Sequence, residues 1–231
     1  MNNLLIIGAF ALVWLWAPTE AAAQQQSFSL AGRVTNATPD GTDVAGVTVV
    51  LHMNTSSGYL EHSTNTNADG QFNFGSNVFI SSAEYWVSVR FQEALYVYDI
   101  DLSAVDLETL TITVYDATDK IDSLFSPSAS ILFAGADKSD QTISALEIVT
   151  IDNNSDHTFV PGTDPMNLLR FGLPDGASNL QVDTDLPSAD FVQVDRGFAL
   201  LTNVSPGEHQ IMYAYRFPYS RSTVSFKKSF I

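Results

Sequence analysis

Residues 85–91 read YWVSVRF, and their strict alternation of apolar and other side chains determines how the chain can fold. Successive side chains of an extended strand point to opposite faces. One face of this strand would carry four core side chains, Tyr85, Val87, Val89 and Phe91. Trp86 would then lie on the other face with Ser88 and Arg90. The pattern predicts a strand that is buried on one side of a sheet.

Similar alternating segments surround this strand in the first half of the chain. They are residues 28–34, 47–52, 60–64, 71–74, 95–102 and 110–115. Clusters of Gly, Asn, Asp and Ser separate them, and no segment shows the 3.6-residue period of a helix. Short strands separated by turn residues predict an antiparallel β-sandwich over residues 27–115.

The second half of the chain repeats this organisation. Residues 116–127 (DATDKIDSLFSP) do not alternate, and we expect a linker there. Further strands are predicted at residues 130–134, 144–151, 168–171, 191–194, 198–201 and 210–217, with Pro-Gly and Pro-Asp-Gly turns among them. The predicted fold class is therefore all-β, with two antiparallel β-sandwich domains, residues 27–115 and 128–231.

The N-terminus predicts export. Residues 4–16 form an apolar run that is shorter than the about 20 residues of a membrane-spanning helix. Ala21, Ala22 and Ala23 follow as a small-residue cleavage site, so residues 1–23 are predicted to be a signal peptide. Because the first residues, MNN, lack Lys and Arg, a retained membrane anchor is the alternative. We expect an extracellular, cell-surface or periplasmic location, and the absence of cysteine fits a bacterial surface protein.

The C-terminus has an unusual pattern. Residues 222–231 have strand character and end on the apolar Ile231, whereas chain ends usually fray. This favours the hypothesis that the second sandwich is truncated, or that a further segment such as a membrane anchor is missing.

Charge and motifs restrict the function. The 26 acidic and 10 basic residues give a net charge of −16, which repels phosphate backbones, so we expect no nucleic-acid partner. The sequence contains no H-E-x-x-H or G-x-S-x-G motif and no phosphate-binding glycine loop. We therefore expect no enzymatic activity and no cofactor.

Four motifs in the first half resemble a known family. They are GRVT (residues 32–35), VAGVTV (44–49), TNADGQFNF (66–74) and YWVSV (85–89). In this order and spacing they resemble the carboxypeptidase regulatory-like family, small transthyretin-like (prealbumin-like) β-sandwiches. The resemblance implies an accessory domain without peptidase activity. It departs at residues 92–94 (QEA), where the family often has a Gly-Tyr turn. Residues 173–177 and 204–209 of the second half resemble Ig-like modules of bacterial surface proteins.

Residues 64–74 (TNTNADGQFNF) allow two interpretations. Asn65, Asn67 and Asp69 alternate before Gly70 as in a calcium-binding loop. The twelfth position would then be Ser76, where a bidentate Glu is needed. In the family resemblance Asp69 and Gly70 form a hairpin turn, in which Gly70 tolerates a positive φ and Asp69 accepts backbone hydrogen bonds. We favour the turn.

Two histidines are a weak metal-site candidate. If Ser56, Ser57 and Gly58 form the loop of a hairpin, His52 lies opposite His62 on one face, with Cβ atoms about 5 Å apart. Such a pair could hold zinc or copper with a third ligand. The sequence shows no third ligand, and we favour two surface histidines and no metal.

Trp86 is the main candidate for ligand binding. An outward-facing indole on a sheet presents a flat apolar surface on which a sugar ring can lie. Tyr96 and Tyr98 share a parity on the next strand and could widen this surface, and Arg90 could donate hydrogen bonds. The alternative is that Trp86 packs under a loop or against the second domain.

These observations lead to two functional hypotheses. The first is a non-catalytic exported surface, adhesion or display module, whose partners are other surface proteins. The second is a carbohydrate-binding module that uses Trp86, Arg90, Tyr96 and Tyr98 to bind a polysaccharide.

Overall fold

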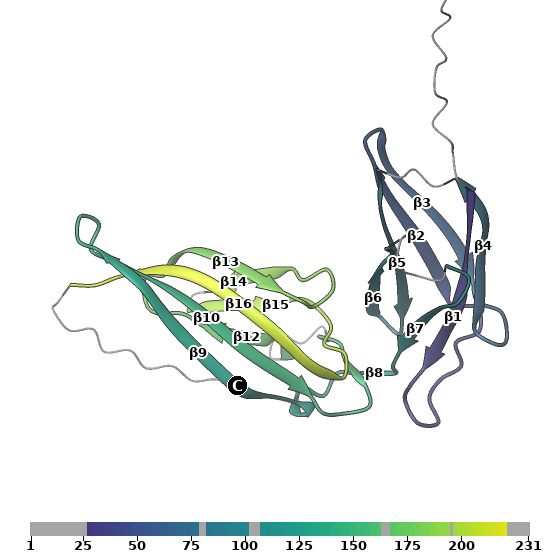
Figure 1. Ribbon diagram of the computed structural model, residues 1–231. Helices are drawn as coiled ribbons and strands as arrows, with labels where there is room; N and C mark the ends of the chain where they lie inside the picture. The colour runs from purple at the N-terminus through teal and green to yellow at the C-terminus, as the bar shows by residue number, and fades with distance from the viewer. Residues whose placement is uncertain (1–26, 79–81, 102–106, 163–166, 195, 221–231) are drawn as a thin grey trace, which may run out of the picture.

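A computed structural model describes residues 27–78, 82–101, 107–162, 167–194 and 196–220 (Figure 1). These residues form an all-β protein of two lobes, as the alternation predicts. The described residues include a 3-10 turn, η1 (Ile121–Ser123). Residues 1–23, the predicted signal peptide, and residues 221–231 lie outside the described part. Among the described residues, no helix has the length and apolar character to cross a membrane.

The first lobe is a sandwich of two sheets. One sheet contains β1 (Ser27–Asn36), β4 (Gln71–Val78) and β7 (Leu110–Val114) in the order β4-β1-β7. The other contains β2 (Thr48–Thr55), β3 (Gly58–Asn65), β5 (Glu84–Phe91) and β6 (Ala94–Asp99) in the order β3-β2-β5-β6. One detail corrects the predicted antiparallel pairing, because β1 and β7 pair in parallel. Parallel partners need a long crossover, which alternation along the chain does not reveal.

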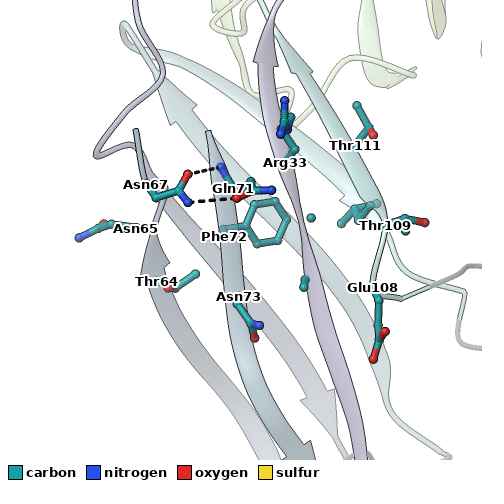
Figure 2. Close-up of a pocket in the computed structure, with 13 residues that line it drawn as sticks. Arg33, Thr64, Asn65, Asn67, Gln71, Phe72, Asn73, Glu108, Thr109 and Thr111 are labelled. Atoms are coloured by element: carbon teal, nitrogen blue, oxygen red, sulfur yellow. Dashed lines mark hydrogen bonds between the residues drawn. The ribbon is translucent and has the colours of Figure 1, made fainter. Parts of the chain in front are cut away.

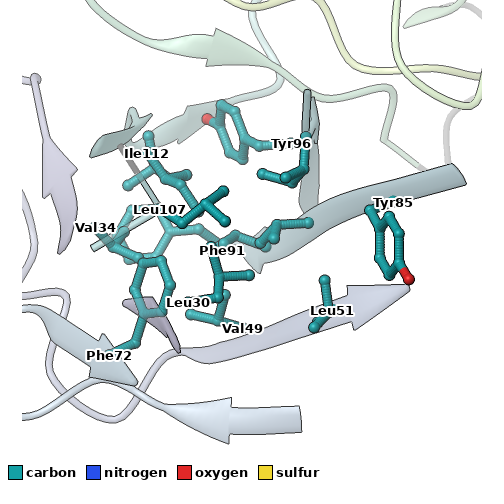
Figure 3. Close-up of a cluster of buried hydrophobic side chains, with 14 of the residues drawn as sticks. Leu30, Val34, Val49, Leu51, Phe72, Tyr85, Phe91, Tyr96, Leu107 and Ile112 are labelled. Carbon is teal, nitrogen blue, oxygen red and sulfur yellow. The ribbon is translucent and has the colours of Figure 1, made fainter. Parts of the chain in front are cut away.

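The core of the first lobe confirms the parity predicted for residues 85–91. Tyr85, Val87, Val89 and Phe91 are all buried, with exposed fractions of 5% or less. Leu30 and Val34 of β1 and Ile112 of β7 come from the opposite sheet to complete this cluster, as Figure 3 shows. Burying an apolar side chain of this size stabilises the fold by about 1.5–3 kcal/mol.

The turn at residues 66–70 is not the predicted hairpin. It connects β3 of one sheet to β4 of the other, so it carries the chain across the sandwich. Gly70 has φ +74°, as expected, and its carbonyl accepts a hydrogen bond from Val34 N at 2.8 Å. The amide acceptor is Asn67 and not Asp69: Asn67 Oδ1 accepts hydrogen bonds from Asp69 N (3.0 Å) and Gln71 N (2.8 Å). Within the described residues, no group of three or more His, Asp or Glu side chains could hold a metal ion.

The second lobe is also a sandwich. Its larger sheet contains β9 (Leu124–Asp137), β10 (Thr142–Asn153), β13 (Ser178–Thr184) and β16 (Gly207–Pro218) in the order β13-β16-β10-β9. The smaller sheet contains β12 (Leu169–Gly172), β14 (Phe191–Val194) and β15 (Gly197–Leu200) in the order β12-β15-β14. Strand β13 was not predicted, and its residues SNLQVDT are mostly polar.

A buried carboxyl group lies in the core of the second lobe. Glu147 on β10 has an exposed fraction of 0% and shares its face of the strand with Ala145 and Val149, which belong to the buried apolar cluster of this lobe. The hydroxyl groups of Tyr213 and Tyr215 on β16 donate hydrogen bonds to its two oxygens, at 2.8 and 2.6 Å. Burial and the neighbouring carboxyl raise the pKa of both tyrosines.

The segment between the lobes is structured and joins them. Strand β8 (Ala117–Thr118) pairs in parallel with β11 (Thr158–Phe159), and Figure 1 shows β8 between the two lobes. Direct hydrogen bonds add to this pairing. Thr38 Oγ1 donates to the carbonyl of Asp156 at 2.6 Å, and the hydroxyls of Tyr96 and Thr158 are 2.7 Å apart.

Candidate functional site

The outer face of the sheet β3-β2-β5-β6 carries the candidate site. Strand register determines which side chains share this face, because directly paired residues point the same way. His52 pairs with Glu61 on one side and with Trp86 on the other, and Trp86 pairs with Asp99 of β6. These four side chains therefore form a row across all four strands.

Three aromatic rings lie together on this face. The rings of His52 and Trp86 are within 7° of parallel, with centroids 5.2 Å apart. Tyr59 of β3 reaches across to both, at 6.0 Å from His52 and 5.8 Å from Trp86. Tyr59 is 51% exposed, whereas Trp86 is half-buried. Offset parallel packing of this kind is favourable by about 0.5–1.5 kcal/mol per aromatic pair. We call Tyr59, His52 and Trp86 the aromatic row.

Hydrogen bonds fix the orientation of two members of the aromatic row, Tyr59 and His52. The hydroxyl of Tyr59 donates to Glu61 Oε1 at 2.6 Å, so it can accept the short hydrogen bond that links it to His52 Nδ1. The other ring nitrogen, Nε2, lies 2.6 Å from the hydroxyl of Ser88. The hydrogen bond to Glu61 also raises the pKa of Tyr59, because it favours the protonated hydroxyl.

Arg90 lies on the same face, farther along β5. Its side chain is exposed, and Nη1 donates to the carbonyl of Glu93 at 3.2 Å. Ser88 separates Arg90 from Trp86 along the strand. The structure thus brings Trp86 and Arg90 to one face, in agreement with the predicted parity.

Tyr96 and Tyr98 do not belong to this face, which corrects the predicted widening of the aromatic surface. Tyr96 pairs with the buried Val89, and Tyr98 with the buried Val87, so both point into the sandwich. Tyr96 is 5% exposed, and its hydroxyl donates to the carbonyl of Tyr115 at 3.1 Å. The hydroxyl of Tyr98 donates to the carbonyl of Thr113 at 2.9 Å. Burial raises the pKa of both hydroxyls.

The predicted pairing of His52 with His62 is also wrong. Thr55 pairs with Gly58, so the loop between β2 and β3 contains only Ser56 and Ser57. This register places His62 opposite the core residue Leu51, on the other face from His52. The two imidazoles cannot share a metal ion.

Two of the cavities on the described surface are lined by residues of the first lobe. One, of about 960 Å³, lies between the lobes and is lined by Arg90, Glu93, Asp119, Leu201 and Asn203 among others. Asn203 Oδ1 accepts a hydrogen bond from Leu95 N at 2.9 Å, and its buried Nδ2 has no hydrogen-bond partner among the described residues. The lining mixes acidic, basic and apolar groups, so this cavity favours no single class of ligand.

The other cavity, of about 690 Å³, lies beside β1 and β4 (Figure 2). Its side chains are mainly polar and include Arg33, Asn67, Gln71 and Glu108. Figure 2 shows Asn67 bound to Gln71, and Asn67 Nδ2 donates to Gln71 Oε1 at 3.1 Å. Because a mainly polar lining does not indicate one class of ligand, the aromatic row remains the better candidate for a binding surface.

Comparisons with known proteins add little to this description. No family model and no curated protein matches the chain. A solved structure of a DUF3823 family protein from Parabacteroides merdae aligns with 80% of this chain and 79% of its own, at 12% identity and a TM-score of 0.27.

Proposed function

We propose that this protein is a non-catalytic exported binding module that binds carbohydrate through the outer face of the sheet β3-β2-β5-β6. The observation that carries the proposal is the aromatic row, in which three nearly parallel rings lie on one sheet face and hydrogen bonds hold two of them, Tyr59 and His52. Within this proposal, the first lobe is a carboxypeptidase regulatory-like domain. The residues of its four motifs fall in β1, in the β1–β2 connection and the start of β2, in the β3–β4 turn and β4, and in β5.

The packing of the aromatic row indicates where a sugar would lie. His52 and Tyr59 contact Trp86 from β2 and β3, and β6 is the neighbouring strand on the other side of β5. On that side Asp99 is paired directly with Trp86, and it is exposed. A sugar ring resting on the indole would bury its C–H groups there, while Asp99 accepts hydrogen bonds from its hydroxyls. Asp99 thus joins Trp86 and Arg90 as a proposed binding residue.

The rigidity of the site also supports binding. The hydroxyl of Tyr59 and the imidazole of His52 are held by Glu61 and Ser88, so the row loses little side-chain entropy when a ligand arrives. Sites on strands of a sandwich are positioned more firmly than sites on loops. The surface-display hypothesis remains the second candidate, and in it the aromatic row is only packing on the sheet face.

Replacement of Trp86 tests the proposal. The chain is screened against soluble polysaccharides by affinity electrophoresis, and binding of each hit is measured by calorimetry. Trp86→Ala is expected to weaken binding at least thirtyfold, because loss of a central tryptophan at an interface typically costs about 2 kcal/mol or more. Asp99→Asn is expected to weaken it less, by about three- to tenfold.

Matched variants give the controls. Phe191→Ala removes an exposed aromatic ring of the second lobe, 37% exposed, and is expected to leave binding unchanged. Tyr98→Phe tests the corrected assignment, and it is also expected to leave affinity unchanged, because its hydroxyl lies inside the sandwich. Glycan binding that Trp86→Ala does not weaken, or no binding across the panel, would refute the carbohydrate proposal in favour of surface display.

A further inference from the structure

The outer face of the first lobe continues from Trp86 to the cavity between the lobes. Along this face the register of β5 and β6 gives three rows of paired residues, Trp86 with Asp99, Ser88 with Val97, and Arg90 with Leu95. Arg90 and Leu95, the last row, also line the cavity between the lobes. Trp86 and Arg90 are four positions apart, which is about 13 Å along a strand. The proposed sugar site and the cavity therefore belong to one continuous surface.

The cavity has the volume and the position of a ligand site. Its volume of about 960 Å³ lies within the range of about 300–1,000 Å³ that is usual for such sites. Ligand sites also occur preferentially at domain interfaces. Residues of the second lobe line the cavity opposite Arg90, and they include Leu201, which is 47% exposed, and the exposed Ser188.

Hydrogen bonds between residues of the lining hold the cavity in shape. Leu95 N of the first lobe donates to Asn203 Oδ1 of the second lobe at 2.9 Å. Ala117 N, in the segment between the lobes, donates to Gln92 Oε1 at 2.7 Å. All four residues line the cavity. Because these contacts already fix the lining, a ligand that binds there orders few further groups.

Strained backbone is concentrated at this cavity. Six non-glycine residues of the described chain have a positive φ, and three of them line the cavity, namely Gln92 (+47°), Glu93 (+70°) and Ser188 (+46°). Gln92 and Glu93 belong to the first lobe and Ser188 to the second, so both lobes contribute. Conformations of this kind cost energy and gather at binding and catalytic sites, which supports a role for the cavity in binding.

Asn203 provides an unused hydrogen-bond donor in the lining. Its side chain is only 7% exposed, and Nδ2 has no hydrogen-bond partner among the described residues. A buried donor without an acceptor is unfavourable, so a ligand oxygen that reaches Nδ2 would gain a hydrogen bond without breaking another.

The lining suits a sugar chain once its continuity with the aromatic row is considered. The mixture of groups in the cavity does not by itself identify a ligand. A sugar presents both C–H groups and hydroxyls, and a chain that lies on Trp86 and extends past Arg90 enters the cavity. There Leu201 can cover C–H groups, while the side chains of Ser188 and Asn203 can form hydrogen bonds with hydroxyls.

We propose that the binding surface extends from Trp86 past Arg90 into the cavity between the lobes, so that the ligand is an oligosaccharide segment held by both lobes. The proposal rests on the carbohydrate binding proposed above and adds a second subsite to it. Trp86 and Asp99 form the first subsite, and Ser188, Leu201 and Asn203 form the second. A short saccharide occupies the first subsite alone, and a longer one occupies both.

A length series of one saccharide tests the proposal. A polysaccharide that binds in the affinity screen is cut to a ladder that begins with the disaccharide, and calorimetry measures the affinity of each member. Affinity is expected to rise with chain length until both subsites are filled. Leu201→Ser is expected to weaken binding of the long members about fivefold, the value of a partly buried leucine, and to leave the disaccharide unchanged.

Leu132→Ser is the matched control. Leu132 is also an exposed leucine of the second lobe, 60% exposed on β9, but it does not line the cavity. The substitution is expected to leave the affinity of every member of the ladder unchanged. Unchanged binding of the disaccharide by both variants also shows that the first lobe remains folded.

Alkylation of introduced cysteines gives a second readout, since the natural chain has no cysteine. Ser188→Cys places a thiol in the cavity, and Ser130→Cys places one at an exposed position of β9. A saturating long oligosaccharide is expected to slow the alkylation of Ser188→Cys severalfold and to leave Ser130→Cys unchanged. The disaccharide is expected to slow neither.

The second subsite and the first can fail separately. Affinity that depends on Trp86 but not on chain length would overturn the extension into the cavity, and the carbohydrate site at Trp86 would stand. Ser188→Cys that stays unprotected by a saturating long oligosaccharide would have the same meaning. If no saccharide binds, both proposals are refuted.

Discussion

The hydrogen-bonded cluster of Glu147, Tyr213 and Tyr215 makes the sharpest prediction about stability. All three side chains are at most 2% exposed, and both carboxyl oxygens of Glu147 accept a hydroxyl hydrogen. Each hydrogen bond to a charged group contributes about 1.5–3 kcal/mol. We therefore expect Tyr215→Phe to destabilise the second lobe by about 1.5–3 kcal/mol and Tyr213→Phe by a similar amount.

Once both hydroxyls are removed, removal of the carboxylate should restore part of the lost stability. Tyr213→Phe with Tyr215→Phe leaves a buried carboxylate without these two donors, so we expect a loss of about 3–6 kcal/mol. Adding Glu147→Met to this pair replaces the carboxylate with an apolar side chain of similar length. The triple variant is expected to be more stable than the double variant by about 1–4 kcal/mol.

Calorimetric unfolding across a pH series measures these effects. The ordinary pKa of tyrosine is 10.0, and burial first, with Glu147 adding to it, raises the pKa of both hydroxyls in the folded state. The folded state therefore holds these protons when the unfolded chain releases them. Their contribution to stability is complete below about pH 10 and is lost as the pH rises above that value. The double Phe variant should lose this alkaline dependence.

A triple variant that is no more stable than the double variant would refute the reasoning. It would show that the buried carboxylate of Glu147 does not destabilise the fold once the two tyrosine hydroxyls are removed. A loss below about 0.5 kcal/mol for Tyr215→Phe, the value expected of ordinary surface substitutions, would refute it as well. The hydrogen exchange of β10 and β16 amides, measured beside the calorimetry, locates any change in the second lobe.

Two further predictions concern the first lobe. Gly70→Ala should lower stability more than Gly46→Ala in thermal unfolding. Both glycines have φ +74°, so the backbone strain of an alanine is similar at the two positions. An added Cβ at Gly70 would lie 2.5 Å from the carbonyl oxygen of Val34, whereas an added Cβ at Gly46 would meet no atom within 4 Å. Gly46→Ala is expected to cost about 1–2 kcal/mol from backbone strain alone, and equal losses would contradict the close approach. Burial tends to raise the pKa of Asp116, but hydrogen bonds from Asn36, Thr42 and Gln92 outweigh it and hold the pKa below 3.8. Its contribution to stability is thus present above the unfolded value and lost as the pH falls through the folded one. Asp116→Ala should lower stability at pH 7 by about 1–3 kcal/mol and flatten the decline measured between pH 5 and pH 2, and an unchanged acid profile would count against this assignment.

The sequence predicts the first lobe well because its strands are buried on one face only. Such strands alternate, and the seven predicted segments each correspond to one of β1 to β7. The second lobe was predicted less completely. Strand β13 has the burial pattern of a half-exposed edge strand and contains a register shift between Ser178 and Gln181, so its sequence lacks clean alternation. Long-range pairings, such as that of β1 with β7, are not encoded in local pattern at all.

The two errors at the candidate site share one physical cause, which is the length of a turn. Side chains alternate with a period of two, so a change of one residue in a loop moves every following side chain to the other face. Taking Gly58 as part of the loop placed His62 beside His52, whereas Gly58 is the first residue of β3. Between β5 and β6, Phe91 pairs with Ala94, and this tight turn directs Tyr96 and Tyr98 into the core.

The second turn was the harder one to predict, and the reason lies in its backbone. A two-residue hairpin loop with positive φ at both positions normally contains Asn-Gly or Asp-Gly. Here Gln92 and Glu93 adopt φ values of +47° and +70°, although neither residue favours that region. Hydrogen bonds of the Gln92 side chain compensate for this strain: its Nε2 donates to Asp116 Oδ1 at 3.0 Å, and its Oε1 accepts from Ala117 N at 2.7 Å. The register that separates Trp86 from Tyr96 and Tyr98 therefore depends on contacts with residues that are about 25 positions away, which local pattern cannot supply.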